Sequence, residues 1–365
     1  MRKNTYLCKA NRNFSIMERN NNSGLQLCGF FERVGYLFFL LVLLSCSNNR
    51  NSNLFPTDGL PYTSVGESMH YSSMVFMNDT LGYLFGTLSR NSDKTCENYI
   101  FQTDDGGHHW QIVSCFSNGK TLISGEVVDD NQGNLYRLLR NLSEESDYVE
   151  RYSIADGKVV LRKKFQSRAS LIGAYKGLLY VLVNIDNQDI INVYNENLEV
   201  QHSYPAFPFY NGLVFEHKLY CLSANQDNGE SDLCRLDKDG HELICLPLDP
   251  GALTLWGNEL LIMGDKKNEE RIYVASYDVE SNKSVLLSSF DGYSIIRFLE
   301  SNNNHVIAVL GKDPFSGDFF YSNDGGKTWR KYALPHYAFI DAITLIQDKA
   351  MIIYDADEFE KIDLI

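Results

Sequence analysis

The chain has 365 residues, of which 33 are lysine or arginine and 47 are aspartate or glutamate, so its formal net charge is −14 at pH 7. This excess of negative charge argues against nucleic acid or an anionic membrane surface as a partner, because both are negatively charged and bind basic surface patches. Beyond the N-terminal region, roughly three hundred residues exceed a usual single-core domain and favour a fold in which each repeat packs only on its neighbours.

The first predicted element is an export signal. Val34–Leu44 is an apolar run of eleven residues that is too short to span a bilayer but has the length of a signal-peptide hydrophobic region. The following Leu43-Leu44-Ser45-Cys46 resembles a bacterial lipobox, which implies cleavage before Cys46, diacylation of its sulfur and attachment to a membrane by lipid alone. Residues 1–46 are therefore predicted to be a lipoprotein signal peptide ending at Cys46, and the alternative is a buried apolar strand.

Residues 47–58 begin with an Asn/Ser-rich stretch and are predicted to be a flexible tether, with residues 59–365 forming one domain. Removing residues 1–46 takes away six basic and two acidic residues, which leaves a net charge near −18. We expect the protein in the bacterial cell envelope. By analogy with lipoprotein sorting, the outer membrane is favoured, because no Asp follows Cys46 directly.

Seven apolar segments recur at steps of roughly forty to fifty residues, the spacing of four-stranded propeller blades. Their alternation and their β-branched or aromatic content favour strands over helices. The segments are Gly82–Gly86, Leu135–Leu138, Leu179–Leu182, Leu219–Leu222, Leu260–Met263, Val306–Val309 and Met351–Tyr354. The turn signals between them are Asp156-Gly157, Glu196-Asn197, Asp239-Gly240 and Ser281-Asn282. We predict an all-β fold, a seven-bladed β-propeller of four-stranded antiparallel blades.

The seventh unit has room for three strands only, at Ile340–Ile346, Ala350–Tyr354 and Phe359–Ile365. An open ring would expose unpaired strand edges, and full closure removes them. Leu60–Gly66 lies before the first full blade and is predicted to supply the missing outer strand of the last blade. The alternative is a plain linker, because Pro61 interrupts this segment.

Residues 103–110 and 322–329 share the pattern Ser/Thr-x-Asp-Gly-Gly-x-x-Trp. In such a turn the hydroxyl and carboxylate can bond backbone amides, the glycines permit positive φ, and the Trp fixes the returning strand in the core. The pattern resembles the Asp-box, or BNR repeat, of sialidase-like and photosystem-II-assembly-factor-like β-propellers. The residues assigned to the two structural boxes are Thr103, Asp105, Gly106, Gly107 and Trp110, and Ser322, Asp324, Gly325, Gly326 and Trp329.

The resemblance to photosystem-II-assembly-factor-like propellers is the more extensive one, because residues 75–86 before the first box also fit that family's pattern. Its members act as binding and assembly platforms, so the resemblance implies a non-catalytic module, an analogy made at the level of fold. The expected partner is an envelope protein, or a glycan or peptide ligand, and the protein is expected to be a monomer.

No catalytic residue, metal-ligand set or cofactor motif emerges from the sequence. Sialidases hold a substrate carboxylate with three arginines and use a Tyr–Glu nucleophile pair, but the Phe-Arg-Ile-Pro motif of that family is absent. Calcium-loop, phosphate-loop and Gly-x-Ser-x-Gly patterns are absent too. The alternative function is a diverged sialidase-like glycoside hydrolase, which an arginine cluster with a Tyr–Glu pair at the ring's centre would favour.

Five cysteines follow Cys46, and four of them form two pairs that are each equidistant from a turn signal. The pairs are Cys96 with Cys115, and Cys234 with Cys245. Both are candidates for cross-strand disulfides in an oxidising compartment. Cys221 is expected one strand inward at a similar level, where it would compete for Cys234. The alternative is that the thiols are reduced and act as small hydrophobic side chains.

In a four-stranded meander, the second-to-third-strand turns and the links between blades lie on one side of the disc, here called the link face. The first-to-second and third-to-fourth turns, with the Asp boxes, lie on the opposite side, the box face. The links are rich in aromatic residues, which suit sugar stacking and protein hot spots. The predicted ligand-binding residues are Tyr204, Phe207, Phe209, Tyr210, Tyr293, His336 and Tyr337. The alternative is that Phe207 and Phe209 fill the gap between adjacent blades.

Overall fold

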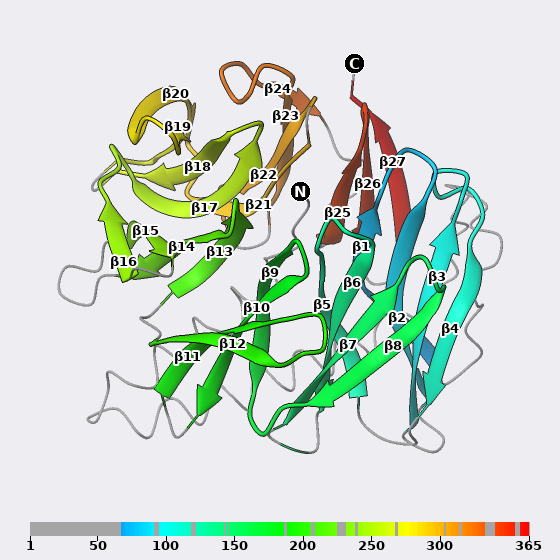
Figure 1. Cartoon of the computed structure of the whole chain (residues 1–365). Coiled ribbons are helices and arrows are strands. Elements are labelled where there is room, and N and C mark those ends of the chain that lie inside the picture. The colour runs from blue at the N-terminus through cyan, green and yellow to red at the C-terminus, as the bar shows by residue number, and fades with distance from the viewer. Residues whose placement is uncertain are drawn as a thin grey trace, which may run out of the picture.

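A computed structural model describes residues 67–90, 95–117, 122–141, 144, 146–185, 188–205, 209–224, 231–237, 240–266, 269–302, 304–313, 316–332, 340–354 and 358–364. All the regular elements in these ranges are β-strands, and they form seven antiparallel sheets (Figure 1). Six sheets have four strands, and the seventh has three within the described residues. No helix in the described ranges is long and apolar enough to cross a membrane.

The first two blades contain β1 (Glu67–Phe76), β2 (Gly82–Arg90), β3 (Thr95–Thr103), β4 (Gln111–Ser117), β5 (Leu122–Asp129), β6 (Asn134–Asn141), β7 (Asp147–Ser153) and β8 (Lys158–Lys164). The third and fourth contain β9 (Ala169–Tyr175), β10 (Leu178–Ile185), β11 (Gln188–Tyr194), β12 (Val200–Pro205), β13 (Phe209–Phe215), β14 (Lys218–Ala224), β15 (Ser231–Asp237) and β16 (Gly240–Ile244). The fifth contains β17 (Asp249–Trp256), β18 (Glu259–Asp265), β19 (Arg271–Asp278) and β20 (Lys283–Asp291). The last two contain β21 (Ile295–Ser301), β22 (Val306–Gly311), β23 (Asp318–Ser322), β24 (Arg330–Tyr332), β25 (Ile340–Ile346), β26 (Lys349–Tyr354) and β27 (Glu358–Asp363).

Each blade is a meander in which consecutive strands pair, and the first strand lies nearest the central axis (Figure 1). The first strands β1, β5, β9, β13, β17, β21 and β25 each contact the first strand of the next blade, and β25 contacts β1. The ring is therefore closed by blade 7 lying against blade 1. This arrangement confirms the prediction of an all-β, seven-bladed propeller.

The seven apolar segments singled out in the sequence are the second strands of the seven blades. These strands are sandwiched between neighbouring blades, so both faces are covered and apolar residues run almost without interruption. In β22, for example, all residues are buried. The predicted turns Asp156-Gly157, Glu196-Asn197 and Ser281-Asn282 lie between the third and fourth strands of blades 2, 3 and 5, so their positions are confirmed as well. In blade 4, Gly240 begins β16 and Asp239 lies outside the described residues.

The hydrophobic core is divided into seven clusters, and each cluster joins two adjacent blades. One cluster joins blade 7 to blade 1 through Ile346, Met351 and Ile353 against Leu84 and Phe101. The core therefore grows around the ring rather than at one centre, which allows a single domain of this length.

The predicted closing strand, Leu60–Gly66, lies outside the described residues, as do the predicted signal peptide, Cys46 and the tether. The three strands predicted for blade 7 are present as β25, β26 and β27.

Candidate functional site

The two Ser/Thr-x-Asp-Gly-Gly-x-x-Trp segments, here called the Asp boxes after the motif that they resemble, form nearly identical turns on the box face. In the first, the Thr103 hydroxyl donates to Asp105 Oδ1 (2.8 Å) and accepts from the Gly107 amide (2.9 Å). Asp105 Oδ1 also accepts from the His108 and His109 amides at 3.0 and 2.9 Å. Gly106 and Gly107 have φ values of 73° and 88°, which glycine adopts without strain. The hydroxyl and carboxylate therefore act within the turn and are not presented to a ligand.

The second box repeats these contacts with Ser322 and Asp324. Ser322 donates to Asp324 Oδ1 (2.8 Å) and accepts from the Gly326 amide (2.8 Å). Asp324 Oδ1 accepts from the Lys327 and Thr328 amides at 3.1 and 2.9 Å. The predicted role of the boxes as hydrogen-bonded structural turns fits this geometry.

The boxes also attach their own blade to the preceding one. Trp110, in blade 1, is 3% exposed and packs in the cluster that contains Met351 of blade 7. Trp329, in blade 6, is only partly buried, and its indole N–H lies 3.0 Å from Ser288 Oγ of blade 5. A box therefore contributes to the contact between neighbouring blades as well as to its own hairpin.

A β-bulge occurs in the first strand of every blade. The register against the second strand shifts at Ser72, Gly125-Glu126, Ile172, Tyr210, Gly251, Arg297 and Asp341. In blades 1, 4, 5 and 6 the shift falls two to three residues after the second residue of the apolar segment, and in blades 2, 3 and 7 it begins closer to that residue. Because a bulge redirects the side chains of its strand, the four bulges at this level act on the same part of the first strand in each of their blades.

Two of the charged bulge residues, Glu126 and Arg297, hold neighbouring segments in place. Glu126 Oε1 lies 3.1 Å from Arg140, and its Oε2 accepts from the Leu171 amide of blade 3 (3.1 Å). Arg297 donates from Nε to the Ser316 carbonyl (2.8 Å), in the segment between the second and third strands of blade 6. Through Glu126 and Arg297, the first strands of blades 2 and 6 are thus connected to segments near the link face.

Four charged residues form a cluster on the link face between blades 2 and 3, here called the link-face cluster: Glu126, Arg140, Asp147 and Arg168. Asp147 is fully buried and accepts from Arg168 (2.9 Å) and from the Ala169 amide (2.9 Å). Arg140 lies 3.7 Å from Asp147. The side chain of Arg168 remains 44% exposed, so its guanidinium is fixed on one side by Asp147 and reaches solvent on the other.

A second charged network is buried between blades 1 and 2. Glu150 forms ion pairs with Arg137 and Arg162, and Arg137 also donates to the Tyr99 carbonyl of blade 1 (3.2 Å). Burial opposes ionisation of Glu150, but the two guanidinium groups outweigh it and lower the pKa of this carboxyl. Arg137 and Glu150 are almost completely buried, so this network holds the two blades together and does not face a ligand.

The predicted aromatic ligand residues are only partly described. Tyr293 is 8% exposed, its hydroxyl donates to Asp318, and its ring packs against Phe290 and Phe320. The prediction of Tyr293 as an exposed binding residue is therefore wrong, because the ring fills the contact between blades 5 and 6. Tyr204 is half-buried at the end of β12.

Phe209 and Tyr210 lie in β13, where Tyr210 is the bulge residue, but their side chains are not described. Phe207, His336 and Tyr337 lie outside the described residues.

The five cysteines after Cys46 are free thiols in the structure, and the two predicted cross-strand pairs are not opposite each other. Cys115 lies opposite Tyr99, because the box loop closes between Gln102 and Gln111 and a bulge at Val113 adds one more residue.

In blade 4 the third-to-fourth hairpin closes between Asp237 and Gly240, which places Leu243, and not Cys245, opposite Cys234. The residue opposite Cys234 on its other side is Cys221, as expected for the competing cysteine.

Among the described residues, no group of three or more His, Cys, Asp or Glu side chains could hold a metal ion. Eight of the described arginines form salt bridges with carboxylates: Arg90, Arg137, Arg140, Arg151, Arg162, Arg168, Arg235 and Arg271. The link-face cluster and the buried Glu150 network were not predicted, because their members come from segments that only the ring brings together.

Solved structures with the same fold include several peptidases. An acylaminoacyl peptidase from Pyrococcus horikoshii aligns with a TM-score of 0.60 and 11% identity, covering 82% of this chain and 52% of that chain. The β-propeller domain of the Trilobed protease from Pyrococcus furiosus aligns with a TM-score of 0.58 and 12% identity, over 81% of this chain and 95% of that domain. An uncharacterized protein from Listeria monocytogenes gives 0.58 and 11% identity, over 84% and 97%.

The chain thus spans about half the length of the acylaminoacyl peptidase that it matches. At these identities the similarity establishes the propeller fold alone. No family model matches the chain, and no curated protein matches it.

Proposed function

We propose that this protein is a lipid-anchored extracytoplasmic β-propeller that acts as a non-catalytic binding or assembly module for an envelope protein or a glycan. The observation that carries the proposal is the bulge in all seven first strands, which lies at one level in four of them. A bulge leaves one residue of the ladder unpaired, and such features are common beside binding sites. Because a bulge redirects the side chains of its strand, bulges in the innermost strands suit a docking surface arranged around one axis.

The link face is the proposed binding surface. The Asp boxes on the opposite face use their hydroxyl and carboxylate groups inside the turns. On the link face, Arg168 offers an exposed guanidinium whose position is fixed by the buried Asp147. A cation held in this way loses little conformational freedom on binding, so it can contact a carboxylate or a polar group of a partner at low entropic cost.

The pairing of the arginines favours a binding module over a diverged sialidase-like hydrolase. Sialidases, as the resemblance implies, direct three arginines at one substrate carboxylate. Arg137, Arg140 and Arg162 of this chain are instead neutralised by Glu150 and Glu126. These three side chains are also more buried than Arg168, with exposed fractions of 2%, 22% and 30% against 44%, so they are less accessible to a ligand.

The membrane anchor is tested by changing Cys46 to Ser. Both cleavage and lipidation need this thiol, so the variant is expected to leave the membrane fraction and appear in the soluble periplasm or the medium. Fractionation of cells that express the variant at the wild-type level gives the answer. A variant that still sediments with membranes to the wild-type extent would show that the lipobox interpretation is wrong.

The binding role is tested by crosslinking in intact envelopes. A photoreactive amino acid at Arg168, on the link face, should capture a partner that mass spectrometry identifies. The same amino acid at Lys327, an exposed residue of the second box, is the matched control on the opposite face. Capture from Lys327 alone would contradict the proposed face, and capture from neither position would contradict a stable envelope partner.

A further inference from the structure

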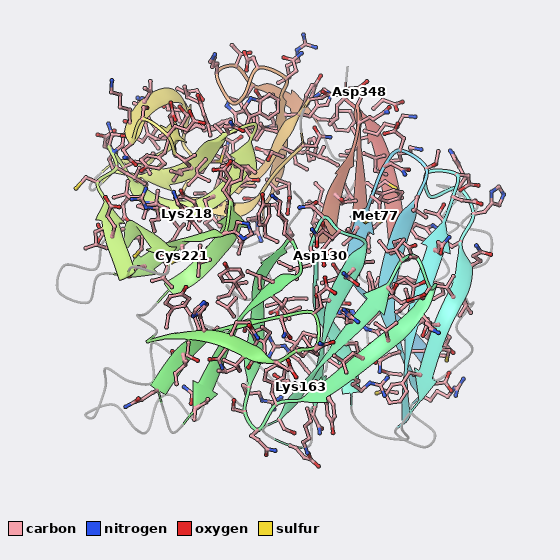
Figure 2. All side chains as sticks on the ribbon, in the orientation of Figure 1. Met77, Asp130, Lys163, Lys218, Cys221 and Asp348 are labelled. Atoms are coloured by element: carbon pink, nitrogen blue, oxygen red, sulfur yellow. The ribbon has the colours of Figure 1, made fainter. Side chains whose placement is uncertain are left out.

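Blade 4 brings two cysteines together in the middle of its sheet. In the register of β14 and β15, Cys221 lies directly opposite Cys234. Both side chains are fully buried, and the Cys221 thiol lies 3.7 Å from the carbonyl oxygen of Cys234 (Cys221 is labelled in Figure 2). Both belong to the core cluster between blades 3 and 4, beside Leu219 and Leu236.

Directly opposed residues of an antiparallel pair have Cα atoms about 4.5–5.5 Å apart. A disulfide requires a Cα separation of about 4.4–6.8 Å, so the spacing of directly opposed residues falls within the range that the bond needs. We propose that Cys221 and Cys234 form a disulfide in the exported protein. The proposal rests on the proposed function, because it is the extracytoplasmic location that supplies oxidising conditions.

The reaction is a thiol–disulfide exchange with an external disulfide, such as a disulfide oxidoreductase or oxidised glutathione. One thiolate attacks the external disulfide and releases one of its sulfurs as a thiol, which leaves a mixed disulfide on the protein. The second cysteine then displaces the other external sulfur, also as a thiol. Cys221 and Cys234 thus lose two protons and two electrons, and the external disulfide takes up both and is reduced to two thiols.

The bond must form before blade 4 packs against blade 3. In the folded ring neither thiol reaches solvent, so an external disulfide cannot reach either of them there. In the chain that emerges from export, the two cysteines are only 13 residues apart, and pairing of β14 with β15 places them side by side. Once formed, the bond is protected from reductants by the same burial.

The test is differential alkylation of the exported wild-type protein. The protein is denatured in guanidinium with a first alkylating reagent, then reduced and treated with a second reagent of different mass. Trypsin cuts after Lys218 and Arg235, so Leu219–Arg235 carries both cysteines on one peptide. We expect both to carry the second reagent, whereas Cys96, which lies beside Ser89 Oγ, carries the first.

The first reagent on both Cys221 and Cys234 in the exported protein would overturn the proposal. A refolding experiment separates the geometry from the location. Purified, reduced protein is refolded with a mixture of oxidised and reduced glutathione and mapped in the same way. If the bond forms in vitro but not in cells, the geometry holds and the proposed compartment is wrong; if it forms in neither, the disulfide itself is refuted.

A stability measurement on the same material adds a second readout. Oxidised protein should unfold at a higher guanidinium concentration than protein refolded under reducing conditions, because the bond restricts the unfolded chain. Equal midpoints for samples that mapping shows to be oxidised and reduced would contradict a stabilising role. The Cys96→Ala variant, which leaves the pair intact, should keep the difference between the two samples.

Discussion

At the scale of single residues, the tryptophans of the two Asp boxes occupy different environments although the boxes match in sequence. Trp110 is almost fully buried between blades 1 and 7, whereas Trp329 is partly exposed. Trp110→Ala should lower the free energy of unfolding by about 3–5 kcal/mol, and Trp329→Ala by less, because less surface is lost from the core. Guanidinium unfolding followed by circular dichroism measures both.

The matched controls are Trp110→Phe and Trp329→Phe, which keep an aromatic ring but lack the indole nitrogen. The Trp110 indole nitrogen has no hydrogen-bond partner among the described residues, whereas that of Trp329 meets Ser288 and the Gly326 carbonyl. Trp110→Phe should therefore recover much of the lost stability through ring packing alone. An equal loss for Trp110→Ala and Trp329→Ala would contradict this assignment of the two environments.

The box aspartates should also make stability depend on pH. Partial burial opposes ionisation of Asp105, but hydrogen bonds from the His109 amide and ring and from Thr103 outweigh it and hold its pKa below the usual range. The pKa of Asp324 is lowered in the same way. Because these values lie below the unfolded value of about 3.9, the stabilisation is fully present above about pH 4 and is lost as the pH falls through the folded pKa.

Asp105→Asn keeps the shape of the side chain but removes its charge. We expect a loss of about 1–2 kcal/mol at neutral pH, because the turn amides then bond a neutral acceptor. The difference from wild type should shrink as the pH is lowered below about 4. Unfolding midpoints measured across this range test the prediction, and a difference that stays constant with pH would show that the charge of Asp105 is not involved.

The box turns could be predicted from sequence because all their contacts lie within eight residues. The cysteine pairs could not, since one bulge at Val113 and the asymmetry of the box loop together move Cys115 three residues from the position facing Cys96. The burial of Tyr293 could not be predicted from its position, because a link between blades can hold either an exposed or a buried aromatic ring. A turn can therefore be predicted from neighbouring residues in the sequence, whereas the register of a strand depends on the strand with which it pairs.

At the scale of strands and blades, the sequence predicts the second strands well and the contacts between blades poorly. A second strand such as β22 is apolar throughout because two neighbours cover it. The Glu150 network, in contrast, joins β6, β7 and β8 of blade 2 to Tyr99 of blade 1. In so acidic a chain, no spacing distinguishes a carboxylate of this kind from one on the surface.

The network gives a prediction for the contact between blades 1 and 2. Glu150→Gln leaves the buried Arg137 and the partly buried Arg162 without a counter-ion, so we expect a loss of about 3–5 kcal/mol in unfolding free energy. The matched control is Glu144→Gln, which breaks the exposed pair with Lys164 and should cost about 1 kcal/mol or less. Chemical denaturation of both variants distinguishes a buried charge network from a surface ion pair, and equal losses would contradict its structural role.

At the scale of the whole molecule, closure of the ring depends on contacts between residues far apart in sequence. The first strand, β1, lies against β25, and the core of that contact includes Met351 opposite the first Asp box. The seven units could be counted from the sequence because each has an apolar segment of the same kind, and in the first six units a turn signal or box follows it. The bulges of the first strands could not, because a bulge is a property of pairing and leaves no common residue type in the sequence.

The two faces of the disc differ in a way that a binding assay can detect. The link face carries Arg168, held by Asp147, and Tyr204 at the end of β12; the box face carries His108 and Lys327, both exposed.

Against a captured partner, Arg168→Gln and Tyr204→Ala should weaken binding by roughly ten-fold or more if they lie within the contact, since fixed cations and aromatic rings dominate interfaces. His108→Ala and Lys327→Ala should leave the dissociation constant within about two-fold, because a residue outside the contact contributes little. Titration of each purified variant measures these changes, with unfolding midpoints confirming that the variants remain folded. Weakened binding in the box-face variants, with unchanged dissociation constants for Arg168→Gln and Tyr204→Ala, would place the partner on the opposite side of the ring.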